Sequence, residues 1–147
     1  MRTNRILLVE DNPDDILLTR RALRQAHIES EIIIAKNGIE AVEYLNSLRD
    51  GDVQNKKPDL VLLDLKMDDM NGHEFLGKIR KIDRFKLIPV VILSSSGEAS
   101  DIRKSYQLGA NSYIQKPVEF ERFVETVQTL SAYWLGLNKS AKGGNSV

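Results

Sequence analysis

The chain has 147 residues, of which 41% are hydrophobic, so it can bury one well-formed core but is too short for two ordinary domains. Its 21 basic and 21 acidic residues cancel, which leaves no overall field that would draw it to nucleic acid or to an anionic membrane. The absence of cysteine excludes disulfides, thiolate metal sites and cysteine nucleophiles. We expect a cytoplasmic protein, because the first apolar run is too short for a signal peptide or a membrane span.

Short apolar runs rich in β-branched residues predict strands at residues 6–9, 31–35, 60–63 and 88–93, with a weaker run at 112–114. Segments of helical period separate these runs. Near-continuous apolarity indicates strands that are covered on both faces, and alternation with helices indicates a parallel sheet with right-handed crossovers. The sequence therefore predicts a doubly wound α/β fold.

Polar residues mark where the helices between these strands begin. Pro13 at a first helical position and Glu40 three residues after an asparagine strengthen two of the predicted starts. Gly109 is expected to end the fourth helix. The predicted N-caps are Asn12, Asn37, Asn71 and Ser100.

The last helix is predicted over about residues 118–135, where apolar residues recur at intervals of three and four. Gly136 is expected to end it. The predicted folded domain therefore covers residues 1–135, and the polar residues 136–147 are predicted to form a mobile tail. Residues 49–57 are predicted to form a polar loop before the third strand.

Polar groups follow every central strand of the predicted sheet, and open parallel sheets bind ligands outside the carboxyl ends of their strands. Three carboxylates brought together repel one another unless a cation neutralises them, and carboxylate oxygens favour Mg²⁺ or Mn²⁺. A lysine and a hydroxyl group beside them could hold the oxygens of a phosphoryl group. The residues at the strand ends are Glu10, Asp11, Asp64, Ser94, Ser95 and Lys116.

Five segments, LLVEDNPDD, LVLLDLKM, MNG, VVILSSS and YIQKP, occur in the order and spacing of the receiver domain of two-component response regulators. Over about residues 4 to 130 the chain resembles that family. The resemblance implies a flavodoxin-like fold, with one five-stranded parallel sheet of order 2-1-3-4-5 flanked by five helices.

The resemblance also implies a role for each matching residue. Asp64 would be the phosphoacceptor. The metal ion, Mg²⁺ or Mn²⁺, would be held by Asp11 and Asp64, by Glu10 through water and by the backbone carbonyl of Lys66. This implies a single-domain regulator that accepts a phosphoryl group from a histidine kinase and thereby switches a protein-interaction surface.

Further residues would respond to the phosphoryl group. Ser94, with Ser95 beside it, would supply the switch hydroxyl, and Tyr113 would be the aromatic residue whose rotamer follows it. Lys116 would bind the phosphate and precede a cis Pro117. Tyr113 could equally be a filler of the strand surface, a reading that the sequence leaves open.

One position departs from the family pattern. Asp68 stands where the family usually has proline, so the loop after the phosphoacceptor is expected to be more mobile than usual. Its negative charge, with that of Asp69, could recruit a metal ion or oppose the incoming phosphate. The loop before the third strand and the segment VETVQTLSAYW resemble standalone regulators that serve phytochrome-type histidine kinases.

Two other functions are less consistent with these residues. Haloacid-dehalogenase-type phosphatases also form an aspartyl phosphate, but they need a second aspartate two residues after the first, where this chain has Lys66. A receiver that binds partners without phosphorylation would not need the full set of site residues. We therefore expect a switch and not an enzyme, with only self-phosphorylation from donors and slow self-dephosphorylation.

The remaining polar residues have simpler explanations. His27 and His73 lack a second histidine at ligand spacing and are expected to be ordinary surface residues. Asp14 and Asp15 are interpreted as first-turn acids that favour the helix dipole. The output is expected to be a protein target, since no helix-turn-helix can follow residue 135 and no basic stripe offers a DNA-binding surface.

The family resemblance suggests self-association through the face formed by the fourth helix, fifth strand and fifth helix. The last helix is longer than the strands, so its final turns should overhang the sheet. Those turns carry Leu130, Tyr133, Trp134 and Leu135, which would be poorly covered in a monomer. The alternative is that Trp134 folds back onto the lower edge of the sheet or onto the first helix.

Overall fold

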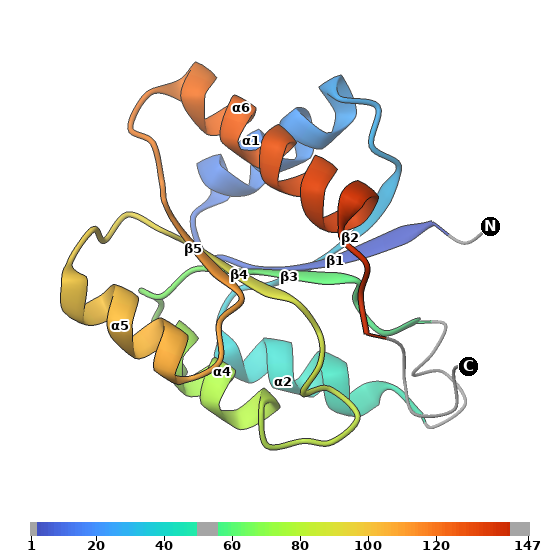
Figure 1. Ribbon diagram of the computed structural model, residues 1–147, viewed down its shortest axis with the longest axis vertical. Coiled ribbons are helices and arrows are strands. Elements are labelled where there is room, and N and C mark those ends of the chain that lie inside the picture. The colour runs from blue at the N-terminus through green and yellow to red at the C-terminus, as the bar shows by residue number, and fades with distance from the viewer. Residues whose placement is uncertain (1–2, 50–55, 142–147) are drawn as a thin grey trace.

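The computed structural model describes residues 3–49 and 56–141 of the chain. Five parallel strands form one sheet of order β2-β1-β3-β4-β5, as the sequence predicted (Figure 1). The strands are β1 (Asn4–Val9), β2 (Ser30–Ala35), β3 (Leu60–Leu63), β4 (Val90–Ser94) and β5 (Ser112–Gln115). The fourth strand therefore begins two residues later than predicted, because Pro89 lacks the N–H that a central strand donates.

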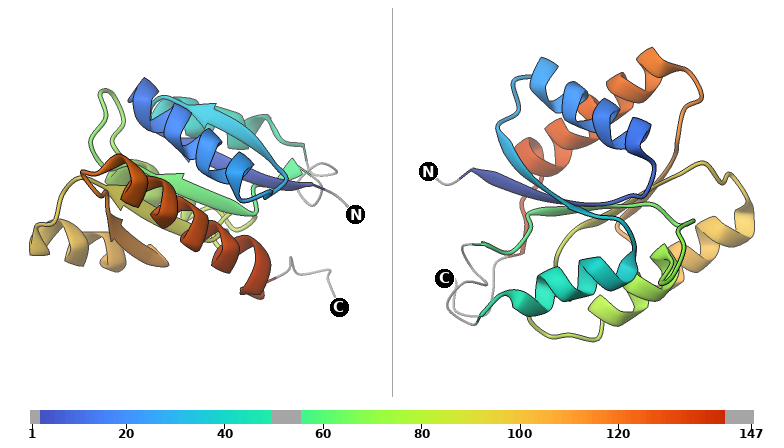
Figure 2. Two further views of the ribbon diagram at one scale, coloured as in Figure 1. Left: turned by 90° about the horizontal axis from the view of Figure 1, so that it is seen from above. Right: turned by 180° about the vertical axis from the view of Figure 1, so that it is seen from behind.

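Helices cover both faces of this sheet. α1 (Pro13–Gln25) and α6 (Phe120–Ala132) lie on one face, and α2 (Gly38–Ser47), α4 (Gly72–Ile79) and α5 (Ala99–Gln107) lie on the other (Figures 1 and 2). Both faces of the sheet are thereby removed from water. The doubly wound, flavodoxin-like class predicted from the sequence is confirmed.

Alternate residues of each central strand enter different cores. Leu7 and Val9 of β1 pack with apolar residues of α2 and α4, while Ile6 and Leu8 pack with those of α1 and α6. The same alternation holds in β3 and β4, whose residues are all buried. Near-continuous apolar strands are the pattern expected when both faces are covered.

Three of the four predicted N-caps are confirmed. The Asn12, Asn37 and Asn71 side chains accept hydrogen bonds from backbone N–H groups of α1, α2 and α4. The prediction for Ser100 was wrong: α5 begins at Ala99, and Glu98 occupies the N-cap position without a side-chain hydrogen bond. Serine is a good cap only when its backbone is extended, and here Ser100 is already helical.

The end of the last helix differs from the prediction. The α-helix begins at Phe120 and gives way at Tyr133 to a π-helical turn (Tyr133–Leu137), so Gly136 lies inside that turn and does not end the helix. The N–H group of Asn138 closes the turn by donating to the Tyr133 carbonyl at 2.7 Å. The predicted mobile tail, residues 136–147, lies partly outside the described residues.

The apolar residues at this end are better covered than expected. Leu130 is 5% exposed, and Trp134 and Leu135 pack against the core that α1 and α6 share with the sheet. Tyr133, at 48%, is the residue of this group that stays open to solvent. The alternative in which Trp134 folds back is therefore the one observed.

A search of the helices in the described part of the chain finds none with the length and apolarity of a membrane span.

Arg80, the C-cap of α4, connects the loops at the amino end of the sheet. Its guanidinium donates to the carbonyls of Lys86 and Ile88, which precede β4, at 2.9 and 2.8 Å. It also donates to the Gly109 carbonyl at 2.9 Å and to the Asn111 side chain at 2.8 Å, just before β5.

Candidate functional site

Three carboxylates meet at the carboxyl ends of β1 and β3. Glu10 and Asp11 follow β1, Asp64 follows β3, and their oxygen atoms lie within 4.8 Å of one another. Glu10 and Asp64 are buried, whereas Asp11 is exposed, so the cluster opens to solvent on one side. The sequence-based prediction that β1 and β3 bring these residues together is confirmed by geometry.

Backbone groups orient the two buried carboxylates. The Leu65 N–H donates to Asp64 Oδ1 at 2.8 Å, and the Asn12 N–H donates to Glu10 Oε2 at 3.2 Å. Gly72 allows α4 to approach this strand end, because a Cβ atom there would collide with the Asp64 carbonyl oxygen.

The positive charge of Lys116 lies among these acids. Its Nζ donates to Glu10 Oε1 at 2.7 Å and to Asp15 Oδ2 at 2.8 Å, and lies 3.7 Å from Asp64 Oδ2. Asp15 was interpreted from the sequence as a helix-dipole acid, and its contact with Lys116 was missed. The two residues are 101 positions apart, so no local pattern signals the contact.

Burial and charge crowding shift the pKa values of these groups. Burial, followed by the Asp64 charge, raises the pKa of Glu10 from 4.5 to about 7. Burial also raises the pKa of Asp64, although Lys116 opposes the rise. For Lys116, burial favours the neutral form, but the hydrogen bonds to Asp15 and Glu10 outweigh it and raise the pKa.

The hydroxyl groups predicted after β4 lie in different surroundings. Ser94 is fully buried, and its Oγ accepts a hydrogen bond from the Ser96 N–H at 3.2 Å. Ser95 is exposed, and its carbonyl accepts from the Gln115 side chain at 3.4 Å. The Lys116 N–H donates to the Ser94 carbonyl at 2.7 Å, which connects the ends of β4 and β5.

Ser96 was not singled out in the sequence, yet it connects several groups. Its carbonyl accepts a hydrogen bond from the Tyr113 hydroxyl at 2.8 Å. Tyr113 therefore contacts the loop that follows Ser94, in addition to packing against the core beneath α2 and α4. Whether its rotamer responds to ligand stays a prediction.

Lys66 follows Asp64 by two residues, and Pro117 follows Lys116. Lys66 is exposed in the loop after β3, and its N–H opposes the rise in the Asp64 pKa that burial causes; the role of its carbonyl stays a prediction. The predicted cis bond before Pro117 was wrong, since the described residues contain no cis peptide bond. Trans is the intrinsically favoured isomer, by about 0.5 to 1 kcal/mol.

The loop after Asp64 has an unusual backbone. Asp69 has a φ of 60°, a left-handed conformation that few residues other than glycine adopt readily. The Met70 carbonyl then accepts a hydrogen bond from the Gly38 N–H at 2.7 Å, which ties the loop to the start of α2. One hydrogen bond thus joins the end of this loop to α2, and the greater mobility expected from Asp68 stays a prediction.

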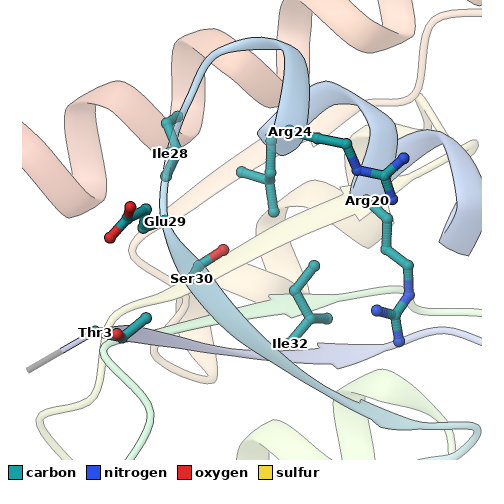
Figure 3. Close-up of a pocket in the computed structure, with 8 residues that line it drawn as sticks. Thr3, Arg20, Arg24, Ile28, Glu29, Ser30 and Ile32 are labelled. Carbon is teal, nitrogen blue, oxygen red and sulfur yellow. The ribbon is translucent and has the colours of Figure 1, made fainter.

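A cavity of about 450 Å³ lies apart from the acidic cluster, at the edge of β2 (Figure 3). Arg20 and Arg24 of α1 lie on one side of it, and Ile28 and Glu29 lie on the other. None of the predicted site residues lines this cavity. It is therefore a separate feature of the surface.

Comparison with known proteins identifies the class of protein that has this fold and this acidic cluster. The model of the response regulator receiver domain matches residues 6–128, and the chain belongs to that family. It is thus a receiver-domain response regulator of two-component signalling, as the five sequence segments indicated.

Individual relatives include regulators from archaea and cyanobacteria. The chain is 39% identical over 135 residues to the probable methanogenesis regulatory protein FilR2 of Methanothrix harundinacea, covering 92% of this chain and 86% of that protein. It is 35% identical over 131 residues to the response regulator Rcp1 of Synechocystis, covering 88% of each.

Solved structures of such regulators have the same fold. The phosphorylated cyanobacterial phytochrome response regulator RcpA is 34% identical, with a TM-score of 0.87 over 96% of this chain and all of that chain (100%). The Mn²⁺-bound form of Rcp1 is 32% identical, with a TM-score of 0.84 over 94% of this chain and 99% of that one. The predicted resemblance to regulators of phytochromes is confirmed.

Proposed function

We propose that this response regulator accepts a phosphoryl group on Asp64 from a sensor histidine kinase and passes the signal on through a changed protein-binding surface. The observation that carries the proposal is the placement of Asp64 beside two further carboxylates and the ammonium of Lys116. Asp64 follows the central strand β3, and the Leu65 N–H orients one of its oxygens.

The acidic cluster fits a hard divalent cation. Three carboxylates within 4.8 Å form an oxygen donor set of the kind that Mg²⁺ and Mn²⁺ prefer. Burial, followed by the Asp64 charge, raises the pKa of Glu10, and Lys116 only partly offsets this rise. Glu10, Asp11, Asp64 and the Lys66 carbonyl would hold the ion, which would neutralise charge on the phosphoryl oxygens.

The transfer itself requires little of the protein beyond orientation and charge. An Asp64 carboxylate oxygen attacks the phosphorus of a phosphohistidine, an oxygen–phosphorus bond forms, and the phosphorus–nitrogen bond breaks. The histidine of the kinase keeps the electron pair and takes up a proton. Lys116 and the Ser94 hydroxyl would then donate hydrogen bonds to the equatorial oxygens.

The relatives suggest the type of kinase. RcpA is named as a phytochrome response regulator, and it matches this chain over almost its whole length. A phytochrome-type histidine kinase is therefore the proposed phosphoryl donor, and another protein is the proposed target. The carboxylate that an aspartyl-phosphate phosphatase needs two positions after the acceptor is replaced by Lys66, which argues against turnover.

The test is labelling of the purified protein with a small-molecule phosphodonor and Mg²⁺, followed by intact-mass measurement. Wild type should gain one phosphoryl group, and Asp64→Asn should gain none. Asp14→Asn, which removes an exposed carboxylate outside the cluster, is the matched control and should label like wild type. Full labelling of Asp64→Asn would overturn the assignment of the acceptor, and an unlabelled wild type would favour a scaffold that works without phosphorylation.

A further inference from the structure

Lys116 contacts carboxylates from two different parts of the fold. Glu10 and Asp64 belong to the acidic cluster at the strand ends, whereas Asp15 belongs to the first turn of α1. Yet the bond from Lys116 Nζ to Asp15, 2.8 Å, is as short as the 2.7 Å bond to Glu10, and Asp64 lies farther away at 3.7 Å. The ammonium group is thus held toward Asp15 and Glu10 and away from the proposed acceptor.

The backbone of Asp15 is fixed by local bonds. Its N–H donates to the Asn12 side chain at 3.3 Å, and its carbonyl accepts from the Thr19 hydroxyl at 2.8 Å. Its carboxylate is 20% exposed and the Lys116 side chain 11%, so the pair is largely shielded from solvent. A charge-assisted hydrogen bond in such surroundings is stronger than one on the open surface.

Asp14 lies in the same turn but has no such role. It also follows Asn12, and its N–H donates to the same Asn12 oxygen at 2.9 Å. Its side chain is exposed, and it is not among the acids that pair with Lys116. Position 14 therefore provides an internal comparison for the effect of charge in the first turn of α1.

We propose that Asp15 is a positioning residue that competes with the phosphoryl group on Asp64 for the ammonium of Lys116. The inference rests on the proposed function, because it assigns a regulatory role within the same site. A lysine ammonium has three N–H donors, and two of them are used by Glu10 and Asp15. Moving toward an oxygen on Asp64 lengthens the Asp15 bond, and the Asp15 charge also repels the incoming anion.

The proposal predicts a gain of anion affinity when Asp15 loses its charge. Asp15→Asn keeps the size of the side chain and should bind beryllofluoride, a mimic of the phosphoryl group, about fivefold more tightly at saturating Mg²⁺, since one partly shielded charge contact is worth a factor of that size. Asp15→Glu restores the charge and should return the affinity toward that of wild type. Asp14→Asn should bind like wild type.

A purely structural role for Asp15 gives a different pattern. If the ion pair only fastened α1 to the segment after β5, Asp15→Asn would lower thermal stability and weaken beryllofluoride and Mg²⁺ together. Competition for Lys116 instead predicts tighter anion binding with no gain in Mg²⁺ affinity. Titrations of both ligands, with a melting curve for each variant, separate these results, and unchanged or weaker anion binding by Asp15→Asn would overturn the proposal.

A crystal structure of the wild-type beryllofluoride complex keeps the proposal testable even if Asp15→Asn does not fold. The Lys116 Nζ should then lie on the fluoride ligands and beyond hydrogen-bond distance of Asp15. An intact Lys116–Asp15 bond in that complex would overturn the competition. Beryllofluoride that fails to bind wild type, with no labelling of Asp64, would instead refute the proposed function, so the two failures are distinguishable.

Discussion

The Ser96 hydroxyl donates a hydrogen bond of 2.6 Å to the Asp101 carboxylate, which joins the loop after β4 to the first turn of α5. The same hydroxyl accepts from the Glu98 N–H at 3.3 Å. Ser96 is only 6% exposed, so its hydroxyl depends on these protein partners. The two bonds fix the loop after β4. The proposed switch serine, Ser94, lies two residues before Ser96 in this segment.

Removing this hydroxyl should loosen the loop. Ser96→Ala is expected to lower the free energy of unfolding by about 1 to 2 kcal/mol, because a hydrogen bond to a charged group is lost. Urea unfolding followed by circular dichroism measures the change. Ser95→Ala is the control and should stay within about 0.5 kcal/mol of wild type, since Ser95 is exposed. Equal effects at positions 95 and 96 would contradict a structural role for the Ser96 bond.

His73 should make stability depend on pH. Its Nε2 lies 2.9 Å from Ser105 Oγ, and burial, then the Lys104 charge, lowers its pKa below 6.5, with Asp101 opposing. Between the lowered pKa and 6.5 the unfolded chain binds more protons than the folded one, so stability is retained above 6.5 and falls as pH drops through that window. His73→Gln should lack this decline.

The quantity to compare is the difference in melting temperature between wild type and His73→Gln, because other groups titrate in the same pH range. Melting temperatures measured for both proteins between about pH 5 and about pH 8 provide it. His27→Gln is the matched control, since His27 is exposed. Parallel pH profiles for wild type and His73→Gln would contradict the prediction.

The acidic cluster should give the opposite pH dependence in the absence of metal. Because the pKa of Glu10 rises from 4.5 to about 7, the folded state binds more protons than the unfolded state across that window. Stability should therefore fall as pH rises from 4.5 to about 7, and the raised pKa of Asp64 acts in the same direction. A cation that binds the deprotonated cluster should reverse this loss.

The measurement compares melting temperatures in EDTA and in excess Mg²⁺. The increase caused by Mg²⁺ should be larger at about pH 8 than at about pH 5, because the carboxylates must be ionised to bind the metal. Asp11→Ala should reduce the increase, whereas Lys116→Ala should retain it. An unchanged Mg²⁺ affinity in Asp11→Ala would remove that residue from the metal site.

Substitutions of Trp134 and Tyr133 should distinguish a contribution to core packing from a contribution to self-association. Trp134→Ala is expected to lower the free energy of unfolding by about 2 to 3 kcal/mol, since its partly buried ring packs on the core shared by α1 and α6. Tyr133 is 48% exposed and makes an edge contact with Trp134 at 5.1 Å between ring centroids. Tyr133→Ala should therefore affect stability less.

Light scattering on wild type and on both variants tests the predicted dimer through α5, β5 and α6. If the dimer forms, Tyr133→Ala should weaken it more than its small effect on folding would explain. A monomer at micromolar concentration, with and without a phosphodonor, would contradict self-association. In that case Trp134 contributes to the fold alone.

The parts of this fold that the sequence could predict depend on local chemistry. The alternation of Ile6, Leu7, Leu8 and Val9 between two cores follows from a strand covered on both faces, and it is visible as a continuous apolar run. Asn12 and Asn71 cap their helices through bonds to residues two or three positions away. Such patterns can be predicted because they involve residues that are close together in the sequence.

What the sequence did not predict depends on how separate elements meet in the fold. Asp15 has the same neighbours in sequence as any first-turn acid, and only the fold brings Lys116 to it. The trans bond before Pro117 departs from what the family resemblance implied, and α5 begins at Ala99, one residue before the serine that local preference favours as its N-cap. Ser96 lacked a signal because its partner Asp101 belongs to the next helix.

The guanidinium of Arg80 connects the segments that precede β4 and β5. Its bonds to the carbonyls of Lys86, Ile88 and Gly109 clasp the turns that enter β4 and β5, at the end of the sheet opposite the acidic cluster. Burial, which lowers the pKa of Arg80, leaves it few alternatives to these partners. β4 and β5 are therefore tied together where they begin, whereas Ser94 and Lys116 lie at the opposite ends of these two strands.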